Sequence, residues 1–286
     1  MRINHNITAM NTYRQYNTNT INTNKAMEKL SSGYRINRAA DDAAGLSISE
    51  KMRSQIRGLT QATRNAQDGI SFIQTAEGAL NEVSDMLVRL KELSVQVTNG
   101  TYSSNDTANI GAEMSALGTA IGDIYVNTKF NGQTVFGDQA VTSGALDDND
   151  GTATAASIYY GEDGAQHVDI LDAKTSDLNA LTTATAAAAG ASADPAGVTN
   201  DLVEAAITEV NTTRAAYGAQ QNQLEHASNN MATTKENLQA AESRVRDVDM
   251  AEEMMNYTKN NILLQAAQAM LAQANAQPQG VLQLLQ

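Results

Sequence analysis

The chain has 286 residues and a net charge of −13, with no Cys and only 4% aromatic residues. The lack of Cys excludes disulfides, thiolate nucleophiles and Cys-based metal sites. With so few rings, 42% hydrophobic residues and two Pro, the composition favours helical bundles over a thick core. The acidic surplus lies between Asp138 and Asp201, which argues against a nucleic-acid partner. No apolar run suits a signal peptide or a membrane span of about 20 residues, so we expect neither.

Residues 1–32 predict a helix whose apolar stripe is interrupted. Ile3, Ile7 and Met10 follow a 4,3 spacing, but the tract from 15 to 24 is mostly Asn and Thr. A helix this polar is marginal in isolation. We therefore expect it to be ordered only by neighbours.

A long helix is predicted from 43 to 98. Asp41 and Asp42 precede it, where a cap and negative charge favour a helix start, and Asn99 with Gly100 ends it. Apolar residues in a 4,3 pattern from 52 to 97, with one stutter, mark its buried stripe. The predicted core members of this stripe are Ile56, Leu59, Ile70, Ile73, Leu80, Leu87 and Leu90.

The middle of the chain predicts shorter elements. A helix fits 106–128, and the Asn-Gly pair at 131–132 between β-forming residues predicts a hairpin. A second hairpin fits 157–160 and 167–170. The segments 138–156 and 182–200 are rich in Ala, Thr, Gly and Asp, which predicts surface loops.

The clearest repeat follows. One apolar residue recurs every seven positions over six heptads, which predicts a coiled-coil helix. These residues are Val203, Val210, Tyr217, Leu224, Met231, Leu238 and Val245. Residues 248–275 continue in helical character. The fold class predicted is mainly α, a long antiparallel helical coiled-coil bundle with a small β-hairpin region at the outer tip.

Residues that could carry chemistry are few. His5, His167 and His226 have no His or carboxylate partner at the spacing of a metal motif, and no phosphate-binding glycine loop occurs. We read Asp41 and Asp42 as a helix cap near basic side chains rather than as a metal or acid pair. No catalytic residue, metal site or cofactor is predicted, and the chain is not expected to be an enzyme.

Two terminal sequences identify a resemblance. MRINHN at 1–6, LSSGYRINRAADDAAGL at 30–46, NAQDGI at 65–70 and QTAEGAL at 74–80 resemble the N-terminal region of bacterial flagellins. AESRVRDVDM at 241–250 and QAAQAMLAQAN at 265–275 resemble the C-terminal region. The match at both ends, in this order, covers about 1–137 and 200–286.

The resemblance implies a subunit that polymerises into the helical flagellar filament for swimming motility. It implies an N-terminal inner-tube helix and spoke at 1–40, wall helices with the first hairpin at 41–137, a short acidic insert at 138–200, a wall helix at 201–247 and an inner-tube helix at 248–286. The terminal helices are expected to fold on assembly. The residues expected to be buried there are Ile3, Ile7, Leu263, Leu264, Met270, Leu271, Leu282 and Leu285.

Partners and modification are also implied by the resemblance. The partners are other copies of the chain, an export chaperone, and the hook-associated junction and cap proteins, with type III export to the extracellular flagellum. Arg89, Leu93 and Glu113 match flagellin positions sensed by Toll-like receptor 5. Candidate O-glycosylation positions are Ser143, Thr152, Thr154 and Ser157.

Two other functions compete with the filament subunit. A hook–filament junction protein shares the same architecture, but the full signature at 30–80 favours flagellin. An enzyme in the insert would need a metal or catalytic motif between 138 and 200, where His167 is the sole histidine. A generic coiled-coil adhesin would not account for two matched terminal signatures.

Overall fold

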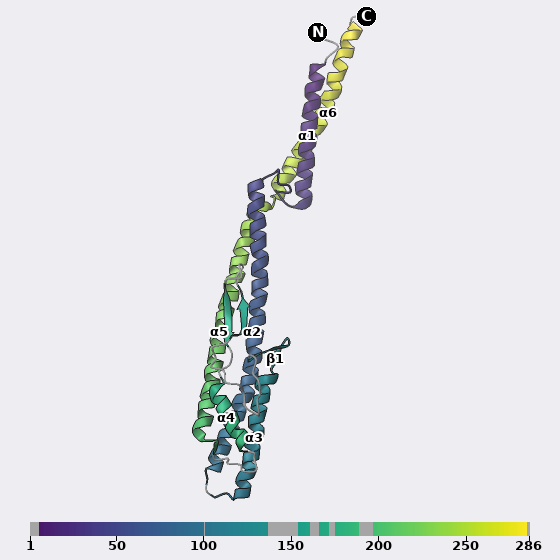
Figure 1. Cartoon of the computed structure of the whole chain (residues 1–286). Helices are drawn as coiled ribbons and strands as arrows, with labels where there is room; N and C mark the ends of the chain where they lie inside the picture. The colour runs from purple at the N-terminus through teal and green to yellow at the C-terminus, as the bar shows by residue number, and fades with distance from the viewer. Residues whose placement is uncertain are drawn as a thin grey trace. The chain divides into compact units, whose positions relative to one another are not determined.

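The structure is a computed structural model that describes residues 6–99, 101–136, 154–160, 166–171, 175–188 and 197–284. The chain forms two compact units. We call Met1–Ile56 with Glu236–Gln286 the terminal unit, and Arg57–Lys235 the central unit. Long helices build both units, so the predicted mainly α class is confirmed (Figure 1).

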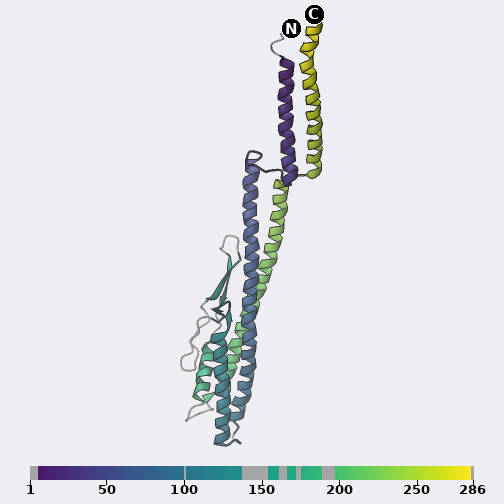
Figure 2. The ribbon, with the colours of Figure 1, turned by 90° about the vertical axis from the view of Figure 1, so that its right-hand side faces the viewer.

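Two long helices, α2 (Ala43–Val97) and α5 (Asn200–Arg246), run antiparallel through the central unit (Figures 1 and 2). As residue numbers rise along α2 they fall along α5, from Glu77 with Arg214 at 4.0 Å to Lys91 with Glu204 at 3.7 Å. The Oγ of Ser94, a polar break in the apolar stripe, donates to the carbonyl of Lys91 and lies 3.2 Å from Asn200 Oδ1. The polar interruption is therefore satisfied internally.

The predicted stripe and heptads form the core of this unit. Along both helices, most of the predicted residues are almost completely buried. They are Leu59, Ile73, Leu80, Leu87, Leu90, Val203, Val210, Tyr217, Leu224 and Met231. Ile56, Ile70, Leu238 and Val245 are half-buried. The coiled-coil interpretation is confirmed.

A shorter pair of helices, α3 (Ser104–Asn127) and α4 (Ser176–Ala187), completes the central unit. Ser103 and Asp106 form a capping box at the start of α3. The prediction of loops over 138–156 and 182–200 is wrong for 154–156, which belong to a strand, for 182–187, which belong to α4, and for 200, which begins α5. Leu178, Leu181 and Thr185 of α4 are buried, because α4 packs closely on α3 at Gly118. The Ala- and Thr-rich composition of this segment does not distinguish a loop from a helix. Its packing against α3 therefore determines that it is a helix.

Gly118 is the point of closest approach between α3 and α4. A Cβ added there would lie 2.0 Å from Thr185 Oγ1 and 2.8 Å from Thr185 Cβ. We expect Gly118→Ala to destabilise the chain by about 1–3 kcal/mol through overpacking. Gly78 of α2 has no neighbour within 4 Å, so Gly78→Ala should instead stabilise by about 0.5–1 kcal/mol. Urea unfolding of the two variants checks both signs.

Both predicted hairpins form. In the first, β1 (Lys129–Phe130) pairs with β2 (Gln133–Thr134) across Asn131 at φ 50° and Gly132 at φ 84°, the positive values that an Asn-Gly turn requires. In the second, β3 (Thr154–Tyr159) pairs antiparallel with β4 (His167–Leu171).

The β3–β4 hairpin does not lie at the outer tip of the bundle, where the hairpin region was expected. The amide of Asn65 on α2 donates to the carbonyl of Tyr159, and Ile158 lies against Gly69. The β3–β4 pair thus lies along the side of α2, while the α2–α3 turn occupies the end of the central unit (Figure 2). A Gly on α2 leaves room there for a strand to approach, which the sequence pattern did not reveal.

In the terminal unit, α1 (Ile7–Ser32) and α6 (Met250–Leu284) lie side by side and antiparallel (Figures 1 and 2). Asn6 caps α1 by accepting from the amide of Ala9, and Gly33 ends it at φ 75°. The helix predicted over 248–275 continues to Leu284. The start of α1 and the end of α6 are therefore neighbours.

Candidate assembly surface of the terminal helices

The seam between α1 and α6 joins a largely polar side of α1 to a mostly apolar side of α6. Asn6 Nδ2 donates to the carbonyl of Ala274 at 2.7 Å, and at the other end Lys29 lies 3.8 Å from Glu253. Between them the least exposed positions recur every three or four residues on both helices. On α1 they include Tyr16, Asn19, Thr20, Thr23 and Ala26, and on α6 Tyr257, Asn261, Leu264, Ala267, Leu271 and Ala274.

The threonines of this polar tract satisfy their hydroxyls within α1 itself. The hydroxyls of Thr18, Thr20 and Thr23 donate to carbonyls four residues earlier in α1, so they need no partner outside the helix. Asn19 is only 5% exposed on the side that faces α6. On the α1 side, the seam therefore buries few large apolar side chains.

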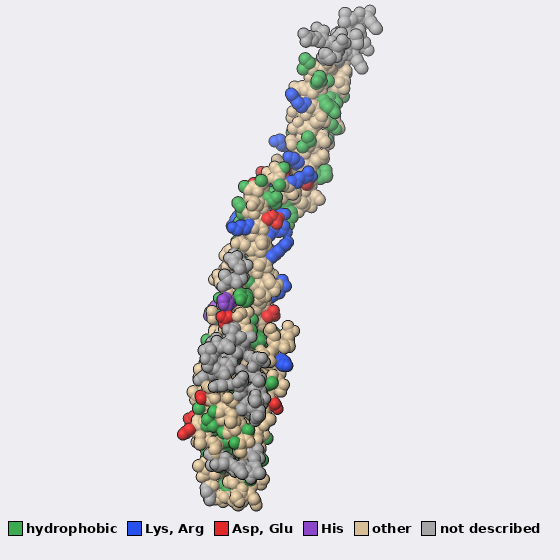
Figure 3. Space-filling view, viewed as in Figure 1, with side chains coloured by type: hydrophobic (Ala, Val, Ile, Leu, Met, Phe, Trp, Pro, Cys, Tyr) green, Lys and Arg blue, Asp and Glu red, His purple; other side chains and the backbone are tan. Residues whose placement is uncertain are grey.

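The large apolar side chains of both helices face outward instead. Ile7 is 69% exposed, Met10 68% and Met255 67%, in the most extreme cases. Hydrophobic side chains are accordingly visible on the surface of this unit (Figure 3). The others are Tyr13, Ile21, Met27, Met250, Met254, Ile262, Leu263 and Met270. In a helical hairpin that is stable alone in water, the large apolar residues lie between the helices and polar residues face outward. Here large apolar side chains face outward, and such a surface marks a site of protein contact.

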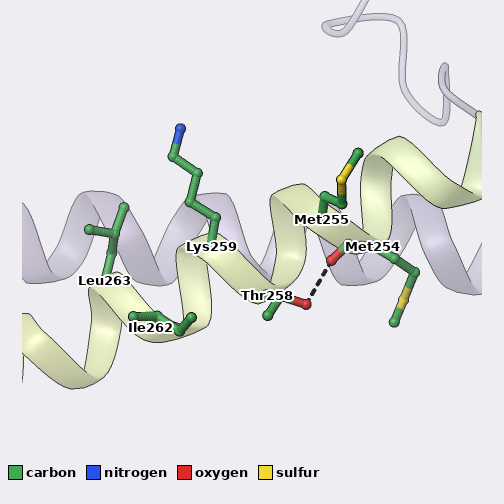
Figure 4. A pocket seen from close by; sticks show the side chains of 6 residues that line it. All are labelled: Met254, Met255, Thr258, Lys259, Ile262 and Leu263. Carbon is green, nitrogen blue, oxygen red and sulfur yellow. Dashed lines mark hydrogen bonds between the residues drawn. The ribbon is translucent and has the colours of Figure 1, made fainter.

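The outer face of α6 is hollowed into a groove with two rows of side chains. One row is Met255, Lys259 and Leu263, and the other is Met254, Thr258 and Ile262 (Figure 4). Each row repeats every four residues, so its members lie on one side of the helix. Thr258 Oγ1 donates to the Met254 carbonyl at 2.8 Å, which leaves the groove floor mostly apolar.

The linkers that join the terminal helices to α2 and α5 also bind each other. The amide of Arg35 donates to the carbonyl of Arg246 at 2.7 Å, and the amide of Val248 donates to that of Gly33 at 3.1 Å. The Arg246 guanidinium lies over the Tyr34 ring and donates to Glu50 Oε1 at 2.7 Å. We call these residues the linker junction.

Of the two aspartates, Asp42 caps the start of α2 as predicted, whereas Asp41 binds the turn that precedes it. Asp42 Oδ1 accepts from the amide of Gly45 in the first turn of α2, and Asp41 Oδ2 accepts from the amides of Asn37 and Arg38. The hydrogen bond from the Arg38 amide holds the pKa of Asp41 below its ordinary value. A carboxylate bound in this way has a local structural role.

Comparison with known proteins identifies the family. Residues 3–140 match the model of the bacterial flagellin N-terminal helical region, and residues 200–285 match that of the C-terminal helical region. A flagellin of Halalkalibacterium halodurans is 50% identical over the full length of both chains, and one of Bacillus subtilis is 49% identical over the full length of both. The chain belongs to the bacterial flagellin family.

Other flagellar proteins resemble it as well. The flagellar filament 33 kDa core protein of Treponema phagedenis is 46% identical to this flagellin-family chain over the full length of both. A Vibrio parahaemolyticus structure described as a flagellar hook-associated protein has a TM-score of 0.59, covers 72% of this chain and all of its own, and is 15% identical. At that identity the likeness concerns the fold alone.

The expected assembly residues divide between two faces of this flagellin-family chain. Ile7, Leu263 and Met270 lie on the outward face, whereas Leu264 and Leu271 are half-buried in the seam. The side chains of the remaining three lie outside the described residues: Ile3, Leu282 and Leu285. The sequence did not indicate Tyr13, Met254, Met255 and Ile262, because it does not show which face of each terminal helix packs on the other.

The other candidate positions lie in the central unit. Arg89 forms an exposed ion pair with Glu113 at 2.9 Å, and Leu93 is buried with 1% exposure. Ser157, exposed on β3, donates to Asp169 at 2.6 Å. Thr154 begins β3, and Ser143 and Thr152 lie outside the described residues. Within the described ranges, no cluster of three or more His, Asp or Glu could hold a metal, and no helix is long and apolar enough to cross a membrane.

The linker junction of this flagellin-family chain should become less stable at acidic pH, because it includes the Glu50 carboxylate. The hydrogen bond from Arg246 lowers the pKa of Glu50 below its ordinary 4.5. Because folding lowers this pKa, the stabilisation is fully present above 4.5 and is lost as the pH falls through the folded value. We expect carbon-13 NMR to show Glu50 titrating below 4.5, and Arg246→Gln to bring its pKa back toward that value. An unchanged titration in that variant would contradict the junction.

Proposed function

We propose that this chain is a structural subunit that polymerises through α1 and α6 into the helical flagellar filament, the appendage for swimming motility. The observation that carries the proposal is the outward apolar face of a helix pair whose seam is polar on the α1 side. Adjacent copies of the chain would bury that face, and burial of apolar surface drives association. The role is structural rather than catalytic.

The alternative is a hook–filament junction protein of the flagellum. The full-length relatives at 46–50% identity carry the names flagellin and filament core protein, which favours the filament. The hook-associated protein of similar fold has far lower identity. A filament subunit is therefore the better supported function.

Assembly is coupled to folding in this proposal. Ordering a residue costs about 1–2 kcal/mol of conformational entropy, and a seam that is polar on the α1 side offsets little of that cost. Segments 1–32 and 250–286 are then disordered in the monomer and helical in the polymer. Residues 260–286 carry no charge, so identical segments can crowd together without repulsion.

The proposed route and partners follow from family membership. The chain travels through the flagellar type III apparatus with an export chaperone and reaches the extracellular flagellum. There it meets the hook-associated junction and cap proteins.

Exposed Ser157 is an accessible position for an O-linked glycan. An intact mass of the native protein equal to the sequence mass would exclude modification.

Toll-like receptor 5 is a further proposed partner. Arg89 and Glu113 present an exposed ion pair on neighbouring helices, whereas Leu93 is buried and offers no surface to a receptor. We expect Arg89→Ala to reduce signalling in receptor-bearing reporter cells without changing the unfolding midpoint. Equal signalling from both proteins would remove Arg89 from the contact.

Seeded elongation tests the proposed function. Purified monomer is added to short filament fragments and followed by electron microscopy. We expect elongation by the native chain and strong loss of elongation by Leu263→Asp, which places a charge on the outward face of α6. Lys259→Gln is a matched control that removes a charge from the same groove. Failure of the native chain to elongate any seed would contradict the proposal.

A further inference from the structure

Methionine is concentrated on the surface of the terminal unit. Of the 11 Met in the chain, six on α1 and α6 are about half exposed or more. They are Met10, Met27, Met250, Met254, Met255 and Met270. The chain has no Cys, so the thioethers are its only oxidisable sulfur atoms.

The central unit provides an internal contrast. Met114 of α3 is 0% exposed and Met231 of α5 is 6% exposed. Oxidation of a thioether follows its exposure, because the oxidant must reach the sulfur. One chain therefore carries accessible and protected methionines on separate units.

Met254 and Met255 are the exposed pair in the α6 groove. They are 50% and 67% exposed and begin the two rows that continue to Ile262 and Leu263 (Figure 4). Because the two residues are consecutive, Met254 begins one row and Met255 begins the other. Each border of the apolar groove therefore starts with a thioether. A change of polarity at these two residues alters the whole end of the groove.

We propose that Met254 and Met255 are a site of oxidation by peroxide-class oxidants. Oxidation of this site before the subunit is incorporated into a filament blocks assembly. The sulfur lone pair attacks one peroxide oxygen, a sulfur–oxygen bond forms, and the oxygen–oxygen bond breaks. The thioether loses two electrons and becomes a sulfoxide. The remaining peroxide oxygen gains them and, with both peroxide protons, leaves as water. This inference rests on the proposed function, because it requires the groove to be covered by another copy of the chain.

A sulfoxide is incompatible with that buried position. It replaces a flexible apolar side chain by a polar one, and burial of a polar group without a hydrogen-bond partner is costly. Incorporation has the opposite effect on access, because neighbouring copies would shield the sulfur atoms. The site therefore discriminates between subunits oxidised before assembly and subunits oxidised afterwards.

Oxidation of full-length monomer tests the site. Monomer is treated with hydrogen peroxide, peptide mass spectrometry measures each sulfoxide, and seeded elongation is measured after peroxide removal. We expect sulfoxide at 254 and 255, little at 114 and 231, and a critical concentration raised about tenfold or more. Methionine sulfoxide reductases of both stereospecificities should restore elongation. Oxidised monomer that elongates like untreated monomer would overturn the proposal.

Two matched double variants assign the effect to the groove. Met254→Leu with Met255→Leu keeps the face apolar, so it should elongate normally and, after peroxide treatment, retain much more elongation than the native chain. Met10→Leu with Met27→Leu on α1 should remain sensitive. If peroxide inhibits both variants equally, the groove is not the site. If the untreated native chain fails to elongate, the proposed function itself fails, and the two failures are thus distinguishable.

Discussion

A chain that lacks residues 1–32 and 250–286 should stay folded and form no filaments at any concentration. The core of the central unit is retained in full, because the buried residues of α2, α3, α4 and α5 between Arg57 and Lys235 remain. The outward apolar face of α1 and α6 is removed entirely. Loss of the surface that neighbouring copies would bury removes the driving force for polymerisation.

Three measurements check this result. Circular dichroism and thermal melting of the trimmed chain should show a cooperative helical core, and seeded elongation should be absent. Hydrogen exchange of the intact chain should show unprotected ends in the monomer and protected ends in the filament. Protection already present in the monomer would contradict folding on assembly. Filaments from the trimmed chain would contradict the assignment of assembly to the ends.

Leu224→Ala should destabilise the central unit by about 2–5 kcal/mol, the range for a buried Leu that leaves a cavity. Leu224 is completely buried at the middle of the α5 heptads. It lies against α2 at Gly69, where Ile158 of β3 also approaches, so one side chain fills the space between two helices and a strand. Neighbours on three elements cannot all move to close the cavity.

Urea unfolding of the central unit measures this effect. Leu263→Ala on α6 is the matched control, because Leu263 is 42% exposed and its truncation leaves no cavity. The control should unfold at the native urea concentration but elongate seeds more weakly. An unchanged midpoint for Leu224→Ala would contradict the coiled-coil core.

Local sequence signals predicted most of the fold. Seven-residue recurrence along α5 and the 4,3 stripe of α2 identified the central core, because a helix presents one face at those spacings. The Asn-Gly pair identified the first hairpin, because both of its residues take the positive φ that the turn requires. The helix α4 was missed, since its burial depends on the close approach of Thr185 to Gly118, far away in sequence.

The assembly surface of the terminal helices was likewise predicted only in part. The sequence by itself determined that the ends are helical, weakly apolar and similar to flagellin termini, because these properties are carried by composition and short motifs. It could not determine which face of each terminal helix meets the other. That choice depends on the fit between two surfaces from opposite ends of the chain, and the polar side of α1, around Asn19, packs on α6. Only the tertiary structure decided that Met10, Met255 and their apolar neighbours face outward, where another copy of the chain can cover them.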